Sequence, residues 1–507
     1  MDLNASGTLL WLMPRIVAYA TIAVVVAWLG HLLEPALTAS FSRRYDAYPW
    51  VKGERGLLQF FSIVHECVFH AGGLFKALYE KMQNSANELF LIPFPHSNTG
   101  FMLLLPVELI GEYAKQPEDV VSFDKYVREV MHAKYSLFGD NMLDNNIQKP
   151  IVRKELVQKL RYKIDMMNEE MVSAMNDTLT SQMDKNGEIR LNVWDTAMKF
   201  LSRTSNRIIV GYPLCRNEEF LKATIDYAVN MFSLAIYVRF IPPFLRPATE
   251  RMQILDESEK TGKEPNLPND LLTVVMKVAK NDPNSHVEYT PMMLVNRVLT
   301  FNFLQSYSNT LTFSNAMYDL VGLPKETFDE TIADLRAEIS SALKEAGGYN
   351  AEFVGKLDFM DSFYRESLRS NPVGDVGLER TIVSEGGFTF SNGLHVPKGA
   401  TLAAPIRGIQ TDQKYYPGGF NPRRALEDPA RPKVTTLSPD FLIFGLGRPA
   451  CPGRWFAITL QKLAMSHILM DYDIECIGKR PQGVRKVTLI EPRDRAQRIV
   501  LRKRKSG

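Results

Sequence analysis

The segment FGLGRPACPGRWFAITL, Phe444 to Leu460, surrounds Cys451 with glycine, proline and arginine and then becomes apolar. Gly445 and Gly447 lack the Cβ atom that would hinder a tight turn or a close approach to a flat ligand. Pro452 is suited to the first turn of a helix, which would carry the following apolar residues into the core. The segment therefore predicts a cysteine held at a helix N-terminus by a glycine-rich loop.

Cys451 is expected to ionise readily in this position. A helix N-terminus stabilises a thiolate through its dipole and its free backbone N–H groups, and Arg448 adds positive charge nearby. A thiolate is a good ligand for a soft metal. The other cysteines, Cys67, Cys215 and Cys476, are interpreted as small apolar residues of the core.

The same segment resembles the haem-binding loop of the cytochrome P-450 family. Phe444, Gly447 and Cys451 have the family spacing, and Arg448 matches a common variant of the family's arginine. The resemblance implies that Cys451 binds haem iron as its axial thiolate. It also implies that the rest of the cofactor-binding loop consists of Phe444, Gly445, Gly447, Arg448 and Gly453.

Two upstream motifs support the resemblance. FYRESLRSNP places Glu366 and Arg369 on one helix face, where they can form an ion pair. The family has a buried pair of this kind, and its third member corresponds to Arg424 in FNPRRALED; the aromatic residue that normally follows is Ala425 here. Arg380, in LERTIV, resembles the arginine that pairs with a haem propionate, and a solvated charge at a strand end is the alternative.

The rest of the chain predicts a mainly α fold with a small β part. Apolar residues at intervals of three and four predict long helices over residues 152–175, 217–239, 291–320 and 326–345. Between residues 379 and 402, β-branched and aromatic runs alternate with turn sequences, which predicts small hairpins. The 507 residues contain no long linker and no repeat, so residues 34–507 are predicted to form a single catalytic domain with the cytochrome P-450 fold that the resemblance implies.

Residues 16–33, IVAYATIAVVVAWLGHLL, form an uncharged run close to the length of a transmembrane helix. They are interpreted as a membrane anchor, and a cleaved signal peptide is the alternative. Basic residues are more frequent after the run than before it, which predicts that residues 1–15 are lumenal and residues 34–507 cytosolic. The resemblance implies a single-pass protein of the endoplasmic reticulum membrane.

Composition excludes several classes of protein. Hydrophobic residues make up 45% of the chain and charged residues 23%, which is typical of a globular protein. The net charge is only +3, from 60 basic and 57 acidic residues, so no nucleic-acid partner is expected. The cysteines form no CxxC motif and no cluster with histidine, which argues against a zinc site and a disulfide framework.

The central helix departs from the family pattern. In the family this helix carries a carboxylate followed by threonine, which relay protons during dioxygen activation. Aligning the end of FNFLQSYSNTLTFSNAMYDL puts Tyr307 at the carboxylate position, Ser308 at the threonine and Asn309 after it, and these are the candidate catalytic residues. No carboxylate occurs between Glu288 and Asp319, although proton delivery needs a donor within hydrogen-bond reach or one water away.

The resemblance implies a haem-thiolate monooxygenase that contains haem b. It implies that electrons come from NADPH through cytochrome P-450 reductase, with cytochrome b5 as a second candidate donor. HAKYSLFG at His132 and GYPLCRNEEF at Gly211 look most like fungal membrane-bound enzymes that tailor secondary metabolites, so a lipophilic terpenoid-like or polycyclic substrate is expected.

The missing carboxylate leaves two interpretations of the reaction. In the first, Ser308 replaces threonine and the protein is a monooxygenase. In the second, the enzyme catalyses oxidative coupling, desaturation or rearrangement without oxygen insertion. A haem-thiolate isomerase or dehydratase and a non-catalytic haem-binding protein are the competing classes.

Other features concern the partners. The basic residues nearest the cysteine loop would dock a reductase if they clustered on one face, and scattered solvated charges are the alternative; they are Arg431, Lys433, Arg454 and Lys462. FIPPFLRP, residues 240–247, is an apolar loop expected to approach the membrane. Phe301, Phe303 and Leu304 are candidates for the substrate pocket, with ordinary core packing as the alternative.

Overall fold

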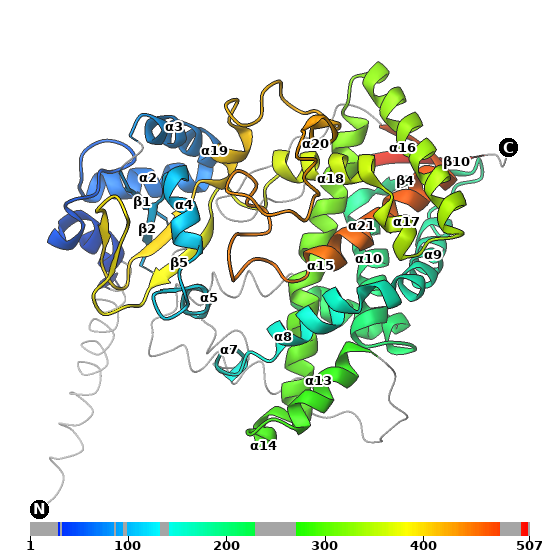
Figure 1. The fold of residues 1–507 in the computed structure, drawn as a ribbon, viewed down its shortest axis with the longest axis horizontal. Coiled ribbons are helices and arrows are strands. Elements are labelled where there is room, and N and C mark those ends of the chain that lie inside the picture. Colours follow the sequence, from blue (N-terminus) through cyan, green and yellow to red (C-terminus); the bar gives the residue numbers. More distant parts are fainter. Residues whose placement is uncertain are drawn as a thin grey trace, which may run out of the picture.

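The computed structural model describes the backbone of residues 29–30, 33–85, 88–94, 99–131, 141–228, 270–476 and 498–504. The predicted anchor, residues 16–33, and the apolar loop at residues 240–247 therefore fall almost entirely outside the described residues. Among the residues that are described, no helix is both long and apolar enough to cross a membrane. Figure 1 shows a sheet region on one side of the molecule and a larger helical region on the other.

A five-stranded sheet organises the first region. Its strands lie in the order β1-β2-β8-β5-β3, with β2 and β8 parallel and the other pairs antiparallel. The strands are β1 (Phe90–Pro93), β2 (Phe101–Leu104), β3 (Val121–Ser122), β5 (Gly377–Ile382) and β8 (Thr401–Ala404). They share a hydrophobic core with the helices α2 (Leu57–Phe69), α3 (Ala71–Gln83) and α4 (Val107–Ala114). The sheet thus brings N-terminal strands against the segment that carries Arg380.

A long helix, α15 (Pro291–Val321), runs through the second region (Figure 1). Thr290 caps it by accepting a hydrogen bond from the Met293 N–H at 3.3 Å, and Pro291 occupies its first turn, where no N–H partner is needed. The helices that pack against it include α10 (Val193–Ile209), α13 (Leu271–Lys280), α18 (Asp358–Ser370) and α21 (Arg454–Asp471). Its apolar residues join the larger of the hydrophobic cores.

The remaining elements surround this framework. An antiparallel sheet combines β4 (Glu188–Asn192), β10 (Arg498–Lys503) and β9 (Tyr472–Cys476), and a hairpin combines β6 (Phe388–Thr389) and β7 (His395–Val396). The other helices are α5 (Phe123–Val130), α7 (Asn141–Asp144), α8 (Gln148–Arg153), α9 (Ile164–Thr180), α14 (Ser285–Glu288), α16 (Lys325–Ala346), α17 (Ala351–Gly355), α19 (Ile406–Thr411) and α20 (Arg424–Glu427), with 3-10 turns at Arg43–Tyr45, Leu160–Tyr162 and Leu214–Arg216 and a π turn at Lys154–Gln158.

The predicted fold class, mainly α with a small β part, is confirmed by this architecture. The helices predicted over residues 291–320 and 326–345 are α15 and α16, and the hairpins predicted between residues 379 and 402 are present. The helix predicted over residues 152–175 is wrong in its first half, where π and 3-10 turns separate α8 from α9. Apolar spacing cannot distinguish these turns from an α-helix, because they place side chains at similar intervals. The helix predicted over residues 217–239 is seen for residues 218–228, where the description ends.

Candidate functional site

The loop before α21 is closed by its own backbone and pressed against α4. The Cys451 N–H donates to the Phe444 carbonyl at 2.7 Å. Gly445 and Gly447 have φ values of +75° and +76°, which L side chains rarely adopt. A Cβ atom on Gly447 would lie only 1.9 Å from the carbonyl oxygen of Ala114. Glycine is therefore required where the loop passes α4.

The Cys451 side chain is exposed at the end of this loop, whereas Cys67 and Cys215 are buried. Helix α21 begins at Arg454, so Cys451 precedes the helix and does not lie in its first turn. Although the thiol reaches solvent, protein atoms crowd around it and raise its pKa; the backbone N–H groups of Gly453 and Arg454 and the charge of Arg454 act in the opposite direction. The predicted easy ionisation therefore does not come from the protein alone, and a bound metal ion would supply the missing stabilisation.

Arg454, rather than the predicted Arg448, is the cation that acts on the cysteine. Its Nη1 donates to the Cys451 carbonyl at 2.7 Å and its Nε to the Thr435 carbonyl at 3.0 Å. The guanidinium also lies 3.5 Å from the ring centroid of Trp455. Arg454 thus ties the cysteine loop to the segment around Thr435. The role of Arg454 could have been predicted from the sequence, because this arginine follows Cys451 within one helical turn.

Arg380 is buried beside the loop, with only 1% of its surface exposed. Its Nη2 donates to the Leu446 carbonyl at 2.8 Å, and the guanidinium lies 5.0 Å from the Tyr113 ring centroid. Burial lowers the pKa of Arg380, and in the described part of the chain no carboxylate forms an ion pair with it. A buried guanidinium of this kind is suited to bind a carboxylate of a ligand.

Arg448 occupies a different environment, because its side chain is exposed. Its carbonyl accepts a hydrogen bond from the Arg153 Nη2 at 3.3 Å. Arg153 lies at the end of α8, distant in sequence from the cysteine loop. Sequence reasoning missed Arg153, because no motif links the two segments.

Glu366 and Arg369 form a buried, bidentate ion pair. The Arg369 Nε and Nη2 donate to the two Glu366 carboxylate oxygens at 2.8 and 2.7 Å. Arg369 is 5% exposed and Glu366 is 2% exposed. Arg424 Nε donates to Glu366 at 3.1 Å, and the backbone N–H of Asn421 donates at 2.8 Å. Arg369 also donates to the carbonyls of Gln410 and Gly419. One carboxylate therefore joins α18 to the chain leaving α19 and to α20.

Ala425 lies next to this ion pair, in the place where the resemblance leads one to expect an aromatic side chain. It is 8% exposed, and its backbone N–H donates to the Ser362 Oγ at 3.1 Å. A cavity of about 370 Å³ has Ala425, Arg369 and Arg424 in its wall. The small side chain thus leaves open space beside the Glu366 network.

The three candidate catalytic residues on α15 lie in different surroundings. Ser308 is exposed, and its Oγ donates to the Leu304 carbonyl at 2.9 Å. The Tyr307 ring packs edge-on against Trp194, at 5.2 Å between centroids. Asn309 is buried, at 3% exposed. Of the three, only Ser308 offers an exposed hydroxyl on this helix.

A buried network of amides and hydroxyls runs along α15 and was missed by sequence reasoning. Gln461 of α21 donates from Nε2 to the Asn309 carbonyl at 3.0 Å, and Asn309 donates from Nδ2 to Gln305 at 3.5 Å. Gln305 donates in turn to the Ser306 Oγ at 2.9 Å. The Gln461 Oε1 is buried and has no hydrogen-bond partner among the described residues, which makes it a place for an ordered water. Polar residues at helical spacing, 302, 305, 306 and 309, were the available signal.

The four basic residues expected to dock a reductase do not form one exposed cluster. Lys462 is only 5% exposed and pairs with Asp361 at 2.6 Å, so this residue was wrongly included. Lys433 is paired with Asp358. Sequence position near the loop could not reveal that α21 turns Lys462 into the interior.

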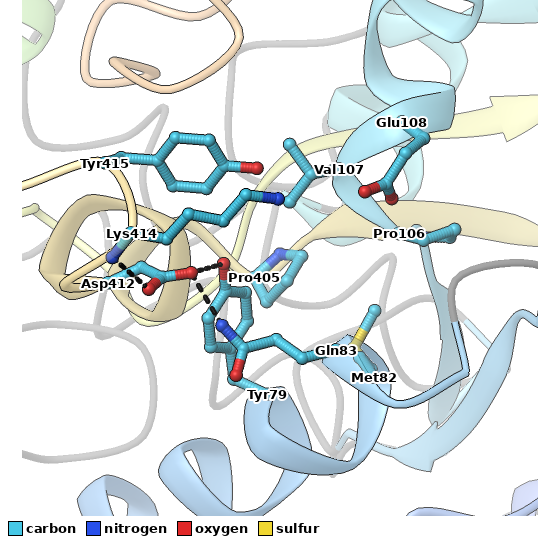
Figure 2. A pocket seen from close by; sticks show the side chains of 10 residues that line it. All are labelled: Tyr79, Met82, Gln83, Pro106, Val107, Glu108, Pro405, Asp412, Lys414 and Tyr415. Atoms are coloured by element: carbon cyan, nitrogen blue, oxygen red, sulfur yellow. Dashed lines mark hydrogen bonds between the residues drawn. The ribbon is translucent and has the colours of Figure 1, made fainter.

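A second cavity lies away from all of these residues, between α3, the start of α4 and the chain after α19. Its volume is about 210 Å³. Figure 2 shows Asp412 at its edge, where it accepts hydrogen bonds from the Tyr79 hydroxyl at 2.9 Å and from the Gln83 amide at 2.6 Å. No residue predicted from the sequence lines it.

The residues around the cysteine loop fit the haem that the resemblance implies. Cys451 presents an exposed thiol, and Gly447 keeps the loop backbone close to α4. Arg380 is a buried cation without an ion-pair partner in the described residues, which suits a propionate. Leu304, which is 60% exposed, and Ser308 offer an apolar and a hydroxyl group on one face of α15.

Comparisons with known proteins agree on one family. A sequence model described as cytochrome P450 matches residues 75–494. "Cytochrome P450 monooxygenase avaL" of Aspergillus versicolor is 26% identical over 440 residues, which cover 78% of each chain. "Cytochrome P450 monooxygenase gloO" of Glarea lozoyensis is 28% identical over 453 residues, covering 80% of this chain and 82% of its own.

Solved structures show the same fold at lower identity. The crystal structure of a cytochrome P450, CYP102L1, superposes with a TM-score of 0.65 and 18% identity, covering 90% of this chain and 99% of the other. Retinoic acid-bound cyanobacterial CYP120A1 superposes with a TM-score of 0.60 and 17% identity, covering 84% and 93%.

The first prediction concerns the Glu366 ion pair. Glu366→Gln removes the negative charge that compensates the guanidinium groups of Arg369 and Arg424, so we expect the free energy of unfolding to fall by about 3–5 kcal/mol and haem to be lost more easily. Urea unfolding and haem absorbance of the full chain measure both effects. The matched control is Glu345→Gln, which removes an exposed ion pair to Lys356 and should change the free energy of unfolding far less, because solvent screens exposed ion pairs. Equal effects of the two variants would contradict the prediction.

The second prediction concerns the turn at Gly447. Gly447→Ala places a Cβ atom where the Ala114 carbonyl already lies, so the loop must move and we expect a protein that folds but retains little haem. Haem content per folded chain is the measurement. Gly355→Ala is the control, because its Cβ would meet no atom within 4 Å. Normal haem content in Gly447→Ala would show that the loop does not need this contact.

Proposed function

The chain belongs to the cytochrome P450 family, and on this premise we propose that it is a membrane-anchored monooxygenase that oxidises a lipophilic secondary-metabolite intermediate. Dioxygen is the oxidant, and the electrons come from NADPH through a separate reductase. The observation that carries the proposal is the exposed Cys451 thiol at the end of a closed glycine loop.

The haem, when bound, supplies the activation of dioxygen, and a thiolate ligand favours cleavage of the O–O bond. The protein holds this ligand in place through the Cys451 N–H, which is tied to Phe444, and through its carbonyl, which is tied to Arg454. Arg380 is placed to bind a propionate from its buried position. The Glu366 ion pairs stabilise the chain segment that precedes the loop.

Proton supply depends on Ser308 and on water. An amide donates a hydrogen bond but does not release its proton at neutral pH, so Gln305 and Asn309 act by orienting water. Ser308 has the exposed hydroxyl, so its Oγ would accept a proton from such a water and pass its own proton on. In this proposal Ser308 and water together do the work of the carboxylate that is missing between Glu288 and Asp319.

Several features support a lipophilic substrate and a membrane location. Leu304 presents an exposed apolar side chain on the face of α15 that carries Ser308. Residues 16–33 form the uncharged run expected of an anchor, and we place the protein in the endoplasmic reticulum membrane with cytochrome P450 reductase as partner. The relatives avaL and gloO carry the name monooxygenase.

A second candidate function is oxidative coupling, desaturation or rearrangement without oxygen insertion. The specific observation in its favour is that the position of the family's carboxylate is Tyr307, whose ring packs on Trp194. A reaction that needs fewer protons would tolerate this arrangement.

Labelled dioxygen distinguishes the two functions. The precursor that accumulates in a host without this gene is supplied to membranes that contain the protein and a reductase, under isotopically heavy dioxygen. We expect the heavy isotope in the product. An oxygen-dependent product without the label would overturn monooxygenation in favour of the second function, and a product formed without dioxygen or NADPH would indicate an isomerase.

Ser308→Ala tests the proton pathway. Removing the hydroxyl should lower the yield of product per NADPH on the order of 10²-fold, with the electrons recovered as hydrogen peroxide. Thr300→Ala is a matched control, because its hydroxyl also donates to a backbone carbonyl of α15. If Ser308→Ala and the control gave the same yield, the hydroxyl of Ser308 would play no part in proton supply.

A further inference from the structure

The cavity of about 370 Å³ next to the Glu366 network has the features of a binding site. Its volume falls in the range of about 300–1,000 Å³ that small-molecule sites occupy. Tyr416 and Pro432 contribute flat or apolar surfaces to its wall, which also includes Ala425. None of these residues belongs to the cysteine loop or to α15.

The wall also contains a buried cation whose hydrogen bonds, among the described residues, all go to backbone carbonyls. Arg365 is 8% exposed, and its Nη1 donates to the carbonyls of Lys433 and Thr436 at 3.0 and 3.1 Å. Unlike Arg369 and Arg424, it forms no ion pair with a carboxylate in the described part of the chain. A buried charge without such a partner is costly, so an anion that enters the cavity is attracted to Arg365.

Of the acidic residues on the wall, Glu366 pairs with Arg369 and Arg424, and neither Asp428 nor Asp440 forms an ion pair with Arg365 in the described part of the chain. The Asp440 carboxylate accepts a hydrogen bond from the Tyr416 hydroxyl at 2.9 Å, and Asp428 accepts one from the Ala430 N–H at 2.8 Å. The Ser438 Oγ, also on the wall, is buried and has no hydrogen-bond partner among the described residues. Arg365 and Ser438 therefore both have donor capacity left for a ligand.

The Phe441 ring holds Arg365 in position, because the guanidinium lies 3.8 Å from the ring centroid. We propose that this cavity binds a small aromatic carboxylate, with the carboxylate at Arg365 and Ser438 and the ring against Tyr416 and Pro432. The site is separate from the oxidation site, so the inference goes beyond the proposed function.

Binding at this site reaches the haem ligand through one short segment, residues 433–436. Arg365 holds the segment from the cavity side, and Arg454 holds it from the other side through the Thr435 carbonyl. Arg454 also binds the Cys451 carbonyl. A carboxylate that draws Arg365 away from the carbonyls loosens the segment, which the Val434 N–H still ties to Asp361, and thereby changes the surroundings of Cys451.

Calorimetric titration of benzoate into the haem-loaded full chain tests the binding. We expect benzoate to bind and cyclohexanecarboxylate, which is not planar, to bind about tenfold more weakly. Ala425→Phe fills the cavity and should abolish binding, and Arg365→Met should weaken it at least about tenfold. Arg423→Met is the control, because Arg423 is a neighbouring exposed arginine that pairs with Asp334.

Two results would overturn the proposal. The first is an absence of binding to the unmodified protein at millimolar benzoate, and the second is undiminished binding to Ala425→Phe, which would place benzoate elsewhere. Ala425→Phe keeps the test valid even if Arg365→Met does not fold. Calorimetry needs no turnover, so failure here is distinguishable from failure of the oxygen-labelling experiment.

Haem absorbance tests the link to Cys451. Benzoate should shift the haem absorption band of the unmodified protein and leave the band of Ala425→Phe unchanged. A band that does not move in the unmodified protein when calorimetry shows bound benzoate would contradict the proposed link.

Discussion

The buried carboxylate of Glu366 is the interaction on which the remaining structure depends. A carboxylate in the interior is tolerated only when cations and N–H groups surround it, and here two guanidinium groups and one backbone amide do so. These partners come from α18, from the start of α20 and from the chain before it. The long connection between β8 and the cysteine loop, which contains little regular structure, is thereby fastened to the helical region. The position of Cys451 follows from this attachment.

The cysteine loop shows how a reactive residue can be exposed and rigid at the same time. Its backbone is closed by a hydrogen bond from Cys451 to Phe444, and its turn is possible because Gly447 passes α4 without a side chain. Arg380 supports the loop from the sheet region, and Arg454 supports it from α21. The site therefore lies where the two regions of the molecule meet, so its geometry depends on both hydrophobic cores.

Helix α15 carries apolar residues of the hydrophobic core and also a set of buried polar side chains. The amides of Gln305, Asn309 and Gln461 link it to α21, the helix that follows Cys451. Buried amides are stabilising only when most of their hydrogen bonds are made, so the unpartnered oxygen of Gln461 marks a place for water. The chain thus has a buried amide network, and no carboxylate, in the part of α15 that carries Ser308. Membership of the family therefore does not by itself determine the type of reaction.

The family and the fold class could be recognised from short local patterns, and the same patterns predict Cys451 as the haem ligand. The residues around Cys451 specify a loop, and the three-residue interval between Glu366 and Arg369 places both on one face of a helix. Both features are local, so neighbouring residues in the sequence determine them. Helices as regular as α15 were also predictable, because their apolar period continues over many turns. Two features required the folded chain: the burial of Lys462 and the cavity beside Ala425. Each depends on which segments meet in space. Burial and pairing between segments that are distant in sequence leave no periodic pattern in the sequence of either segment.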